Sequence, residues 1–346
     1  IMQADLTENI HVVLQAGGTK KWENDWMTDG GIQRFTFEDG TIVPASPVLE
    51  GVQMSEPETL ANFLRWGVTQ YPAQQYILIF WNHGGGTLYG YGCDDLNGKK
   101  WLMLGELNQA LSWADVPFKM VGFDTCLMAT MSTAYMLSDH ADYLLASEEL
   151  EPAKGWRYTK WVSQLSREPD IEMRQLSELI ARDYLDGALE EDWPCATISL
   201  IDLRQMEAVV DAWREVSAEL TQRLQEGRYA DIEQALLDSK MYGLGTAYDQ
   251  VDLVDFMTRL ERVGIGSAKA LGQAAANAVA YCGSTPEMDR SNGLAIYVPY
   301  TKYAQYPGKV RKSLLGSGYG EEDLLFWDAF YEAVKENRPK KLVWPK

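Results

Sequence analysis

The sequence contains few cysteines and few histidines. Its 346 residues include four cysteines and three histidines. Four cysteines are too few for a disulfide scaffold in a chain of this length, and no Cys-x-x-Cys pair indicates a structural zinc site. Cysteine content therefore predicts neither a disulfide-rich fold nor a metal centre, and it leaves the cellular compartment open.

Basic residues are also in deficit. Lysine and arginine together number 31 against 50 aspartates and glutamates, which gives a net charge of −19. A protein that binds nucleic acid needs a basic surface to replace the counterions of the phosphates, so this balance argues against a nucleic-acid partner. The same negative field favours the approach of basic substrates.

Long apolar runs are absent as well. No stretch of the sequence approaches the 18 or so apolar residues that a membrane-spanning helix requires, and we therefore expect no membrane span. No basic segment followed by an apolar one opens the chain. We expect any targeting peptide to have been removed or trimmed.

The composition is that of a globular protein, because 46% of the residues are hydrophobic. Short apolar runs alternate with amphipathic helical patterns, which predicts an α/β fold with helices on both faces of a sheet. The predicted strands are residues 10–16, 76–82, 118–123, 142–147, 197–201 and 293–298.

Local motifs predict a hairpin and a helix start. Asp39-Gly40 stands between the apolar runs 32–37 and 41–43 and predicts a tight β-turn. Ser55-Glu56-Pro57-Glu58 has the form of a capping box, with serine at the cap and proline in the first helical turn. Another helical pattern covers residues 204–225.

The pattern changes after about residue 240, where it becomes mainly helical. The predicted helices there are residues 251–263, 267–282 and 321–337. We therefore expect two units, residues 1–240 and a C-terminal subdomain, residues 241–346, that packs on the sheet.

Two of the predicted strands end on residues that carry chemistry. The stretch YILIFWNHGGG ends on His83 and three glycines, and FKMVGFDTC ends on Cys126. A helical pattern at residues 105–114 lies between them, so the two strands form a parallel βαβ unit. If they are neighbours, His83 and Cys126 lie side by side at the carboxyl edge of the sheet, where open α/β folds place their sites.

This pair of residue types is suited to nucleophilic catalysis. A thiol with a pKa near 8.5 needs activation; a helix N-terminus directly after Cys126 favours the thiolate, and the His83 imidazole can move the proton. The Gly84 N–H is a candidate oxyanion donor. A histidine at a strand end is more often structural and an apolar-flanked cysteine is usually a core residue, but their conjunction favours the functional interpretation.

The sequence resembles the clostripain family of cysteine peptidases in the caspase-like clan. The resemblance rests on QRFTFEDG, MSEPETLANFLRWGVTQYPAQQYILIFWNHGGG, GFDTCLMATMSTAYML and LLASEELEPAKGW. It implies a caspase-like α/β/α sandwich with a mostly parallel central sheet and a mainly helical C-terminal subdomain. It also implies a catalytic domain in residues 1–240, a His83/Cys126 dyad, and cleavage of proteins or peptides after Arg or Lys.

The resemblance extends to the substrate pocket. In clostripain-like enzymes an acidic residue two positions before the nucleophile helps to select a basic P1 side chain, and Asp124 has that position here; a carboxylate suits Lys or Arg. Ser147 and Glu148 fall in the segment that resembles the pocket wall. Glu148 could equally belong to a solvated loop, and Trp156 is more readily explained by packing.

The resemblance also implies how these enzymes mature. Members of the family are processed between the histidine and the cysteine at a site that matches their own P1 preference. Lys99 and Lys100 are the first basic residues after His83, so self-cleavage is expected after one of them. The alternative is an ordinary solvated lysine pair at a turn.

No required cofactor is expected, although calcium is a candidate because some relatives use it. The run Asp94-Asp95-Leu96-Asn97-Gly98 carries oxygen ligands, but its spacing does not fit a calcium loop such as the EF-hand. We interpret it as an acidic turn. Family members are typically bacterial and exported, which implies a secreted or periplasmic location.

Two rival functions remain to be weighed. HGGG also resembles the oxyanion loop of lipases and esterases, but the chain has no G-x-S-x-G motif for a serine nucleophile. A catalytically inactive caspase-like binding or interaction module is the other alternative. The remaining residues of these types are expected to be structural or exposed: His11, His140, Cys93, Cys195 and Cys282.

Overall fold

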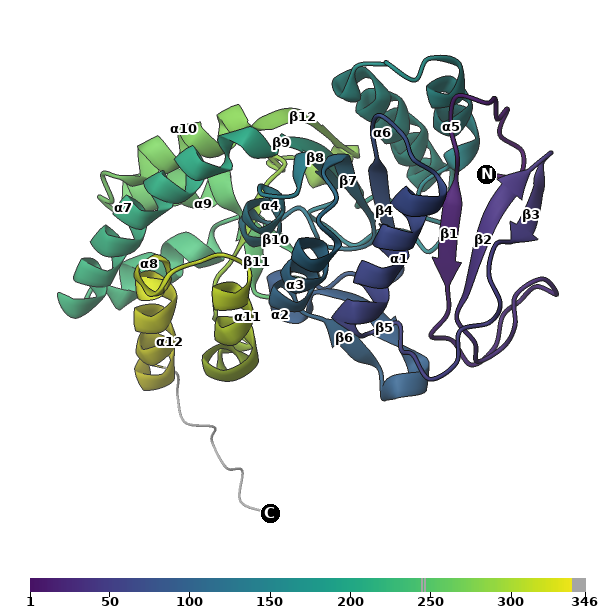
Figure 1. The fold of residues 1–346 in the computed structure, drawn as a ribbon. Helices are drawn as coiled ribbons and strands as arrows, with labels where there is room; N and C mark the ends of the chain where they lie inside the picture. Colours follow the sequence, from purple (N-terminus) through teal and green to yellow (C-terminus); the bar gives the residue numbers. More distant parts are fainter. Residues whose placement is uncertain (244, 246, 338–346) are drawn as a thin grey trace.

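A five-stranded mixed sheet forms the centre of the computed structural model (Figure 1), which describes residues 1–243, 245 and 247–337. The strand order is β12-β9-β8-β7-β4. The strands β4, β7 and β8 are parallel, whereas β9 and β12 are antiparallel to their neighbours. Their bounds are β4 (Ile77–Trp81), β7 (Phe118–Asp124), β8 (Ala141–Ala146), β9 (Thr197–Asp202) and β12 (Val279–Ser284).

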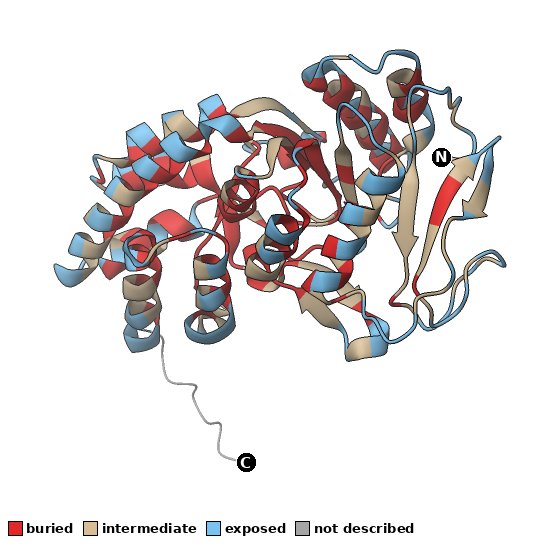
Figure 2. Cartoon of the chain, in the orientation of Figure 1, coloured by how far each residue is buried: buried red, intermediate tan, exposed pale blue. Residues whose placement is uncertain are grey.

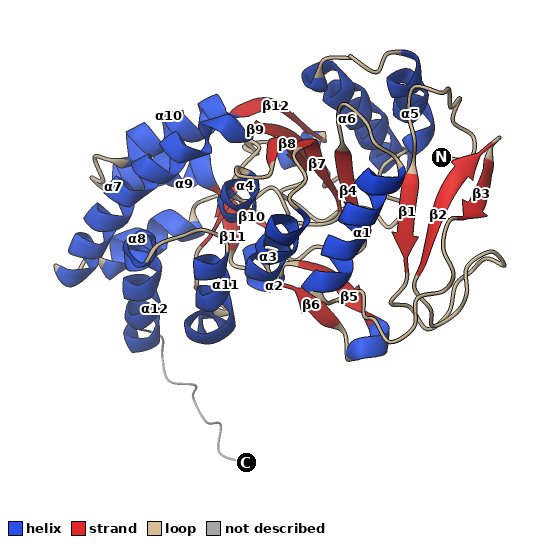
Figure 3. Cartoon of the chain, viewed as in Figure 1, coloured by secondary structure: helices blue, strands red, loops and turns tan. Residues whose placement is uncertain are grey.

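The two faces of this sheet are covered by separate helical layers, as Figure 3 shows. Alternate residues of a strand point to opposite faces. Val121, Leu144 and Ile201 belong to one hydrophobic cluster, whereas Met120 and Leu145 belong to another. The fold is therefore the α/β/α sandwich that the sequence predicts, and Figure 2 shows its strands as mainly buried.

The two layers are unequal in size. The helices α5 and α6 supply the smaller cluster, and the larger cluster draws on the N-terminal half and the C-terminal helices alike. The bounds are α1 (Pro57–Gln70), α3 (Leu104–Ala114), α4 (Met131–Leu137), α5 (Tyr158–Arg167), α6 (Met173–Glu190), α7 (Met206–Gln225), α8 (Tyr229–Leu237), α9 (Leu253–Arg262), α10 (Ala268–Ala278), α11 (Arg311–Gly316) and α12 (Leu325–Asn337).

A small antiparallel sheet precedes the central one in the chain. It consists of β1 (Val13–Ala16), β2 (Gln33–Glu38) and β3 (Thr41–Pro44). Asp39 and Gly40 both have positive φ, 47° and 72°, as a two-residue hairpin turn of the predicted kind requires. The hairpin prediction is therefore confirmed.

The helix start at Pro57 differs from the prediction in its cap. Glu56 is the residue before the helix and makes no side-chain cap hydrogen bond. The Ser55 N–H and hydroxyl instead donate to Asp94 Oδ2 at 3.3 and 3.2 Å. A tertiary contact to the acidic turn has replaced the local cap.

Another departure lies between residues 267 and 282, which we predicted as one helix. The helix α10 ends at Ala278, and Val279–Ser284 continues as the edge strand β12 paired with β9. Val279 and Tyr281 are β-branched and aromatic residues, which favour strands. Pairing with the sheet has overridden the helical periodicity.

A second small sheet joins the C-terminal part of the chain to the centre. It contains β10 (Met241–Tyr242), β11 (Gln250–Asp252) and β13 (Ala295–Tyr297). The Ala295 N–H donates to the Ala129 carbonyl at 2.9 Å, so β13 adjoins the segment that follows Cys126. Among the described residues, no helix combines the length and apolar character needed to cross a bilayer.

Candidate active site

The register of β4 and β7 brings the two candidate catalytic residues together. The strands are parallel neighbours, with Trp81 opposite Asp124. His83 and Cys126 each follow two residues later, so both leave the sheet at its carboxyl edge. The helix α3 connects the two strands, and the predicted βαβ unit is confirmed.

Glycine at position 84 lets the two strand-end loops touch. A Cβ atom on Gly84 would overlap the carbonyl oxygen of Cys126, so any side chain there would push the loops apart. The neighbouring amides are used within the protein: Gly85 donates to Gly90 O and Gly92 donates to His83 O, both at 2.8 Å. Within the described part of the chain, no hydrogen bond uses the Gly84 N–H.

The segment after Cys126 is held by the segment after β8. The Leu127 N–H donates to Glu149 O at 3.1 Å, and the Ala129 N–H donates to Ser147 O at 2.9 Å. The buried Gln250 of β11 joins the same two segments, because its Nε2 donates to the carbonyls of Leu127 (3.2 Å) and Glu148 (3.1 Å). The nucleophile loop is thereby fixed on both sides.

The expectation of a helix directly after Cys126 is wrong. The helix α4 begins at Met131 and is capped by Thr130, whose Oγ1 accepts the Thr133 N–H at 3.0 Å. Residues 127–130 form a turn and an extended segment instead, with Leu127 at a positive φ of 67°. Hydrogen bonds to the neighbouring loop determine the path of the chain here.

A backbone amide contacts the Cys126 thiol in place of a helix N-terminus. The Glu151 N–H donates to Cys126 Sγ at 3.2 Å. Burial raises the pKa of the thiol, and the amide contact opposes that rise because it favours the thiolate. The thiolate therefore depends on a base nearby, the role that suits His83.

Asp124 ends β7, two residues before Cys126, and is almost fully buried, with 3% of its surface exposed. Its Oδ1 accepts the Trp156 N–H at 2.9 Å, and its Oδ2 accepts the Tyr158 hydroxyl at 2.8 Å. Burial raises the pKa of the carboxyl to about 6 in spite of these two donors. Asp124 therefore ionises close to neutral pH.

Glu151 is a site residue that the sequence analysis did not identify. Glu151 is 9% exposed, and its carboxyl group lies against the side chains of Asp124 and Trp156. Burial, Asp124 and Cys126 together raise its pKa well above the ordinary value. Trp156 Nε1 and the Tyr184 hydroxyl, both buried, lie near the Glu151 carboxyl. We call Asp124 and Glu151 the carboxyl pair.

Glu148 and Ser147 do not join this group, contrary to the pocket-wall prediction. The Glu148 carboxyl is fully buried, accepts the Gly293 N–H at 3.0 Å, and faces Asp252. The Ser147 hydroxyl is bonded to Thr197 Oγ1 and to the Glu149 carbonyl, both at 3.0 Å. Both side chains order the loop from inside, so the solvated-loop alternative for Glu148 is wrong as well.

A row of aromatic side chains extends from His83 toward Cys126. The Trp101 ring centroid lies 6.2 Å from the His83 ring and 6.0 Å from the Tyr89 ring. The Tyr89 and Tyr248 rings meet edge to face at 5.9 Å. Burial and the neighbouring Cys126 and Tyr89 raise the pKa of Tyr248. We call Trp101, Tyr89 and Tyr248 the aromatic row.

The predicted processing residues lie at the tip of a hairpin. The strands β5 (Tyr91–Asp94) and β6 (Lys100–Leu102) pair antiparallel, and the acidic turn joins them. Lys99 is exposed, whereas Lys100 is half-buried and pairs with Glu56 at 3.0 Å.

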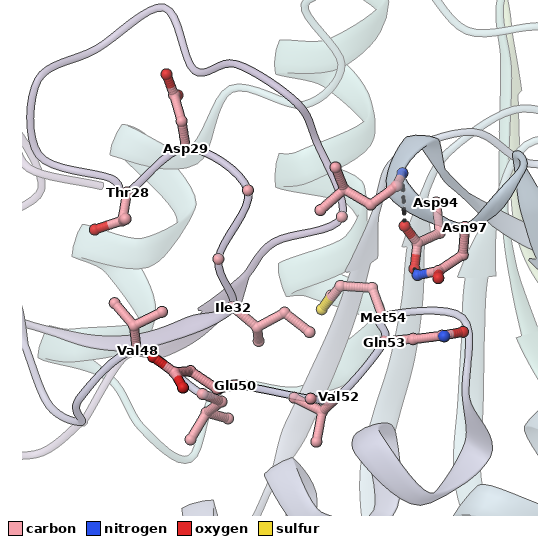
Figure 4. A pocket seen from close by; sticks show the side chains of 16 residues that line it. Thr28, Asp29, Ile32, Val48, Glu50, Val52, Gln53, Met54, Asp94 and Asn97 are labelled. Atoms are coloured by element: carbon pink, nitrogen blue, oxygen red, sulfur yellow. Dashed lines mark hydrogen bonds between the residues drawn. The ribbon is translucent and has the colours of Figure 1, made fainter.

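One cavity lies away from the two strand ends. It has a volume of about 320 Å³ and opens between the N-terminal sheet and the acidic turn (Figure 4). Neither His83 nor Cys126 lines it. Asp94, in its wall, already accepts hydrogen bonds from Ser55, Leu96 and Asn97. In the described residues, no group of three or more potential ligands could hold a metal ion.

Two predictions about the remaining aromatic and polar residues are confirmed. Trp156 is buried and packs in the smaller cluster. His140 is structural, since its Nε2 is hydrogen bonded to Asn108 Oδ1 at 2.8 Å.

An α/β/α sandwich in which adjacent parallel strands end on a histidine and a cysteine defines the caspase-like class of cysteine peptidases. The chain belongs to the clostripain family, which matches residues 33–306. The fold and family are those of a cysteine-type endopeptidase.

Comparison with individual proteins agrees with this placement. Clostripain from Hathewaya histolytica is 25% identical over 313 residues, which cover 73% of this chain but 59% of that protein. The chain therefore spans less than two thirds of the length of that relative.

Solved structures show the same fold. A secreted C11 cysteine protease from Bacteroides thetaiotaomicron, in complex with an irreversible peptide inhibitor, has a TM-score of 0.62 at 20% identity, with 84% of this chain and 86% of that chain covered. An inactive zymogen C11 protease from Parabacteroides distasonis has a TM-score of 0.59 at 21% identity, with coverage of 82% and 84%.

Proposed function

We propose that this chain is a cysteine endopeptidase that cleaves peptide bonds after Lys or Arg through His83 and Cys126. One observation carries the basic preference: two buried carboxyl groups, Asp124 and Glu151, lie against one another, and the Glu151 carboxyl is close to the Cys126 thiol. Buried acidic groups are costly to ionise unless a cation joins them. A basic P1 side chain supplies that cation.

The proposed reaction uses the groups at the two strand ends. His83 takes the proton of the Cys126 thiol, and the sulfur attacks the carbonyl carbon of the scissile bond. The Gly84 N–H, which has no acceptor among the described residues, donates to the oxygen that becomes negative. The C–N bond then breaks, His83 protonates the leaving amine, and water hydrolyses the resulting thioester.

The amide–thiol contact supports this order of events. The Glu151 N–H stabilises the thiolate once His83 has accepted the proton, while the buried surroundings keep the resting thiol protonated. The same residue thus touches the nucleophile through its backbone and extends its carboxyl toward Asp124. The short segment around Glu151 therefore contacts the nucleophile and also carries a carboxyl group that can bind the positive charge of the substrate.

Self-processing is part of the proposal. Lys99 and Lys100 lie at a hairpin tip between His83 and Cys126, and cleavage after either would leave the two residues on separate chains that share the sheet. A relative described as an inactive zymogen supports this step. We also propose a location outside the cytoplasm, as for the relative described as secreted.

The test is a panel of peptides with Lys, Arg or neutral P1 residues, run with and without calcium. We expect turnover of the Lys and Arg peptides, none by Cys126→Ala, and a loss of several orders of magnitude with His83→Ala. Full activity of a folded Cys126→Ala protein would refute the proposal. Selective labelling of Cys126 by a thiol probe at neutral pH separates an enzyme from an inactive binding module.

A further inference from the structure

The aromatic row is not explained by the proposed P1 pocket. Its members are only partly buried. Trp101 and Tyr89 come from the elements that follow β4, and Tyr248 lies between β10 and β11, whereas the carboxyl pair comes from β7 and from the loop after β8. Trp101 is on β6, and Tyr89 ends the short helix α2 (Gly86–Tyr89). Trp101 and Tyr89 therefore lie on the His83 side of the site.

The chemistry of the proposed reaction fixes which part of a substrate reaches that side. His83 protonates the leaving amine, so the nitrogen of the residue after the scissile bond must come within hydrogen-bond reach of its imidazole. The side chain of that residue, P1′, begins one bond further on. A ring packed about 6 Å from the imidazole is therefore within contact distance of the P1′ side chain.

We propose that Trp101 and Tyr89 form the subsite for the P1′ residue and that this subsite favours an aromatic or long aliphatic side chain. The inference rests on the proposed function. Flat aromatic surfaces gain from burying apolar area and from ring stacking, and they offer nothing to an acidic side chain.

The two rings are held in place by their own contacts. Trp101 Cζ3 lies 3.3 Å from the position that a Cβ atom on Gly85 would occupy, so the absence of a side chain there lets the ring pack on the backbone. The Tyr89 hydroxyl accepts a hydrogen bond from Gln305 Nε2 at 3.2 Å. Rigid walls lose little freedom when a substrate binds.

One competing explanation has a different experimental signature. Trp101 directly follows Lys100, and its ring could simply block the site until the chain is cut. In that case Trp101→Ala would raise the rate with every peptide. If Trp101 is part of a subsite, it contributes to selection of the P1′ side chain. Its removal then lowers the rate only for peptides with a large apolar P1′ residue.

The experiment measures kcat/KM for quenched fluorescent peptides that share Lys at P1 and differ at P1′ as Phe, Leu, Gly or Asp. The wild-type enzyme should prefer Phe to Gly by about tenfold or more. Trp101→Ala should reduce that ratio to within about threefold, and Trp101→Phe should keep most of it. Trp113→Ala, which removes a 48% exposed tryptophan from α3, is the matched control and should not change the ratio.

A lysine methyl ester separates the two proposals, because it has a basic acyl part and no P1′ side chain. If the ester is hydrolysed and all four peptides are cleaved at the same rate, only the P1′ subsite is overturned. An ester that is not hydrolysed would overturn both proposals. If Trp101→Ala does not fold, the wild-type preference still decides, since a preference for Gly or Asp contradicts the subsite.

Discussion

At the scale of single residues, the site contains two carboxyl groups whose charge depends on pH and on the presence of a cation. Asp124 and Glu151 are both buried; Asp124 raises the pKa of Glu151, whereas the contact with Glu151 lowers the pKa of Asp124. The Trp156 N–H and the Tyr158 hydroxyl favour the ionised form of Asp124. Asp124 is therefore the member that ionises first, and under the proposed function a basic P1 side chain would stabilise the charge of both.

The pH dependence of P1 selection follows from the raised pKa of Asp124, about 6. Above that pH the carboxylate is present and binds a cation; below it the group is neutral. The ratio of kcat/KM for Lys over a neutral P1 residue should therefore rise between pH 5 and pH 7. The ratio isolates Asp124 because both substrates use the same thiol and imidazole, and a ratio that is flat with pH would remove Asp124 from P1 recognition.

Sequence reasoning reached one member of the carboxyl pair and not the other. Asp124 matches the acidic residue that clostripain-like enzymes carry two positions before the nucleophile, so the resemblance identified it. Glu148, Glu149 and Glu151 lie in a loop, where no period of two or of 3.6 indicates which side chain points inward. All three turn out to be buried, and only tertiary contacts distinguish their roles.

At the scale of elements, two loops and one strand hold the nucleophile in place. The turn after β7, the segment after β8 and Gln250 of β11 are joined by backbone and amide hydrogen bonds. Elements far apart in the sequence thus meet at Cys126. No local motif could have predicted this clamp, because each of its hydrogen bonds joins residues more than 15 positions apart.

Gln250→Ala tests the clamp. The substitution leaves the carbonyls of Leu127 and Glu148 without their buried donor, which should cost about 1–3 kcal/mol of unfolding free energy. It should also lower kcat more than it raises KM, because the nucleophile moves while P1 binding persists. Urea unfolding and steady-state kinetics measure the two effects. Wild-type kcat in a destabilised variant would show that the clamp serves stability alone.

Strand prediction succeeded where apolar runs were short and bounded, as for β4 and β7, whose ends differ from the predicted ones by one residue. It failed at β12, where Val279–Ser284 continues a helical pattern. A single helix covering residues 267–282 was the simpler interpretation, but an edge position beside β9 was available and offered backbone partners. The position of Val279–Ser284 beside β9, rather than its local periodicity, determines that this segment is a strand.

At the scale of the whole molecule, a buried acidic contact joins the sandwich to the C-terminal part of the chain. Glu148 follows β8, Asp252 ends β11, and Gly293 precedes β13. Burial first, and then Asp252, raise the pKa of Glu148 well above its ordinary value of 4.5. The two-unit division at residue 240 stays a prediction, and the hydrophobic core runs continuously across that point.

The stability of the molecule should depend on pH through Glu148. In the folded protein this carboxyl stays protonated, whereas in the unfolded chain it ionises above pH 4.5. Stability is therefore lost as pH rises from 4.5 toward the folded-state pKa, by up to about 1.4 kcal/mol per pH unit. Glu148→Gln removes the effect and should stabilise the protein more at pH 7.5 than at pH 5 in urea unfolding. An equal effect at both pH values would contradict the raised pKa.

Self-cleavage is also a property of the whole chain. Intact-mass analysis of incubated enzyme should show two fragments, the first ending at Lys99 or Lys100 and the second beginning at the next residue. Native size-exclusion should show one particle, because β4 and β7 remain paired. Cys126→Ala should stay whole. A fully active enzyme that remains one uncut chain would show that maturation at this site is not required.

Replacement of the P1 lysine by norleucine tests the central claim most directly, because norleucine keeps the aliphatic stem and lacks the ammonium group. A buried ion pair that loses one partner costs about 2–5 kcal/mol, so the wild-type enzyme should prefer Lys in kcat/KM by more than tenfold. Asp124→Asn and Glu151→Gln, which preserve side-chain shape, should each reduce that preference, and the double variant should abolish it. Glu149→Gln, whose Oε1 accepts the Gly243 N–H outside the carboxyl pair, should retain it. Equal cleavage of the lysine and norleucine peptides by the wild-type enzyme would contradict the account.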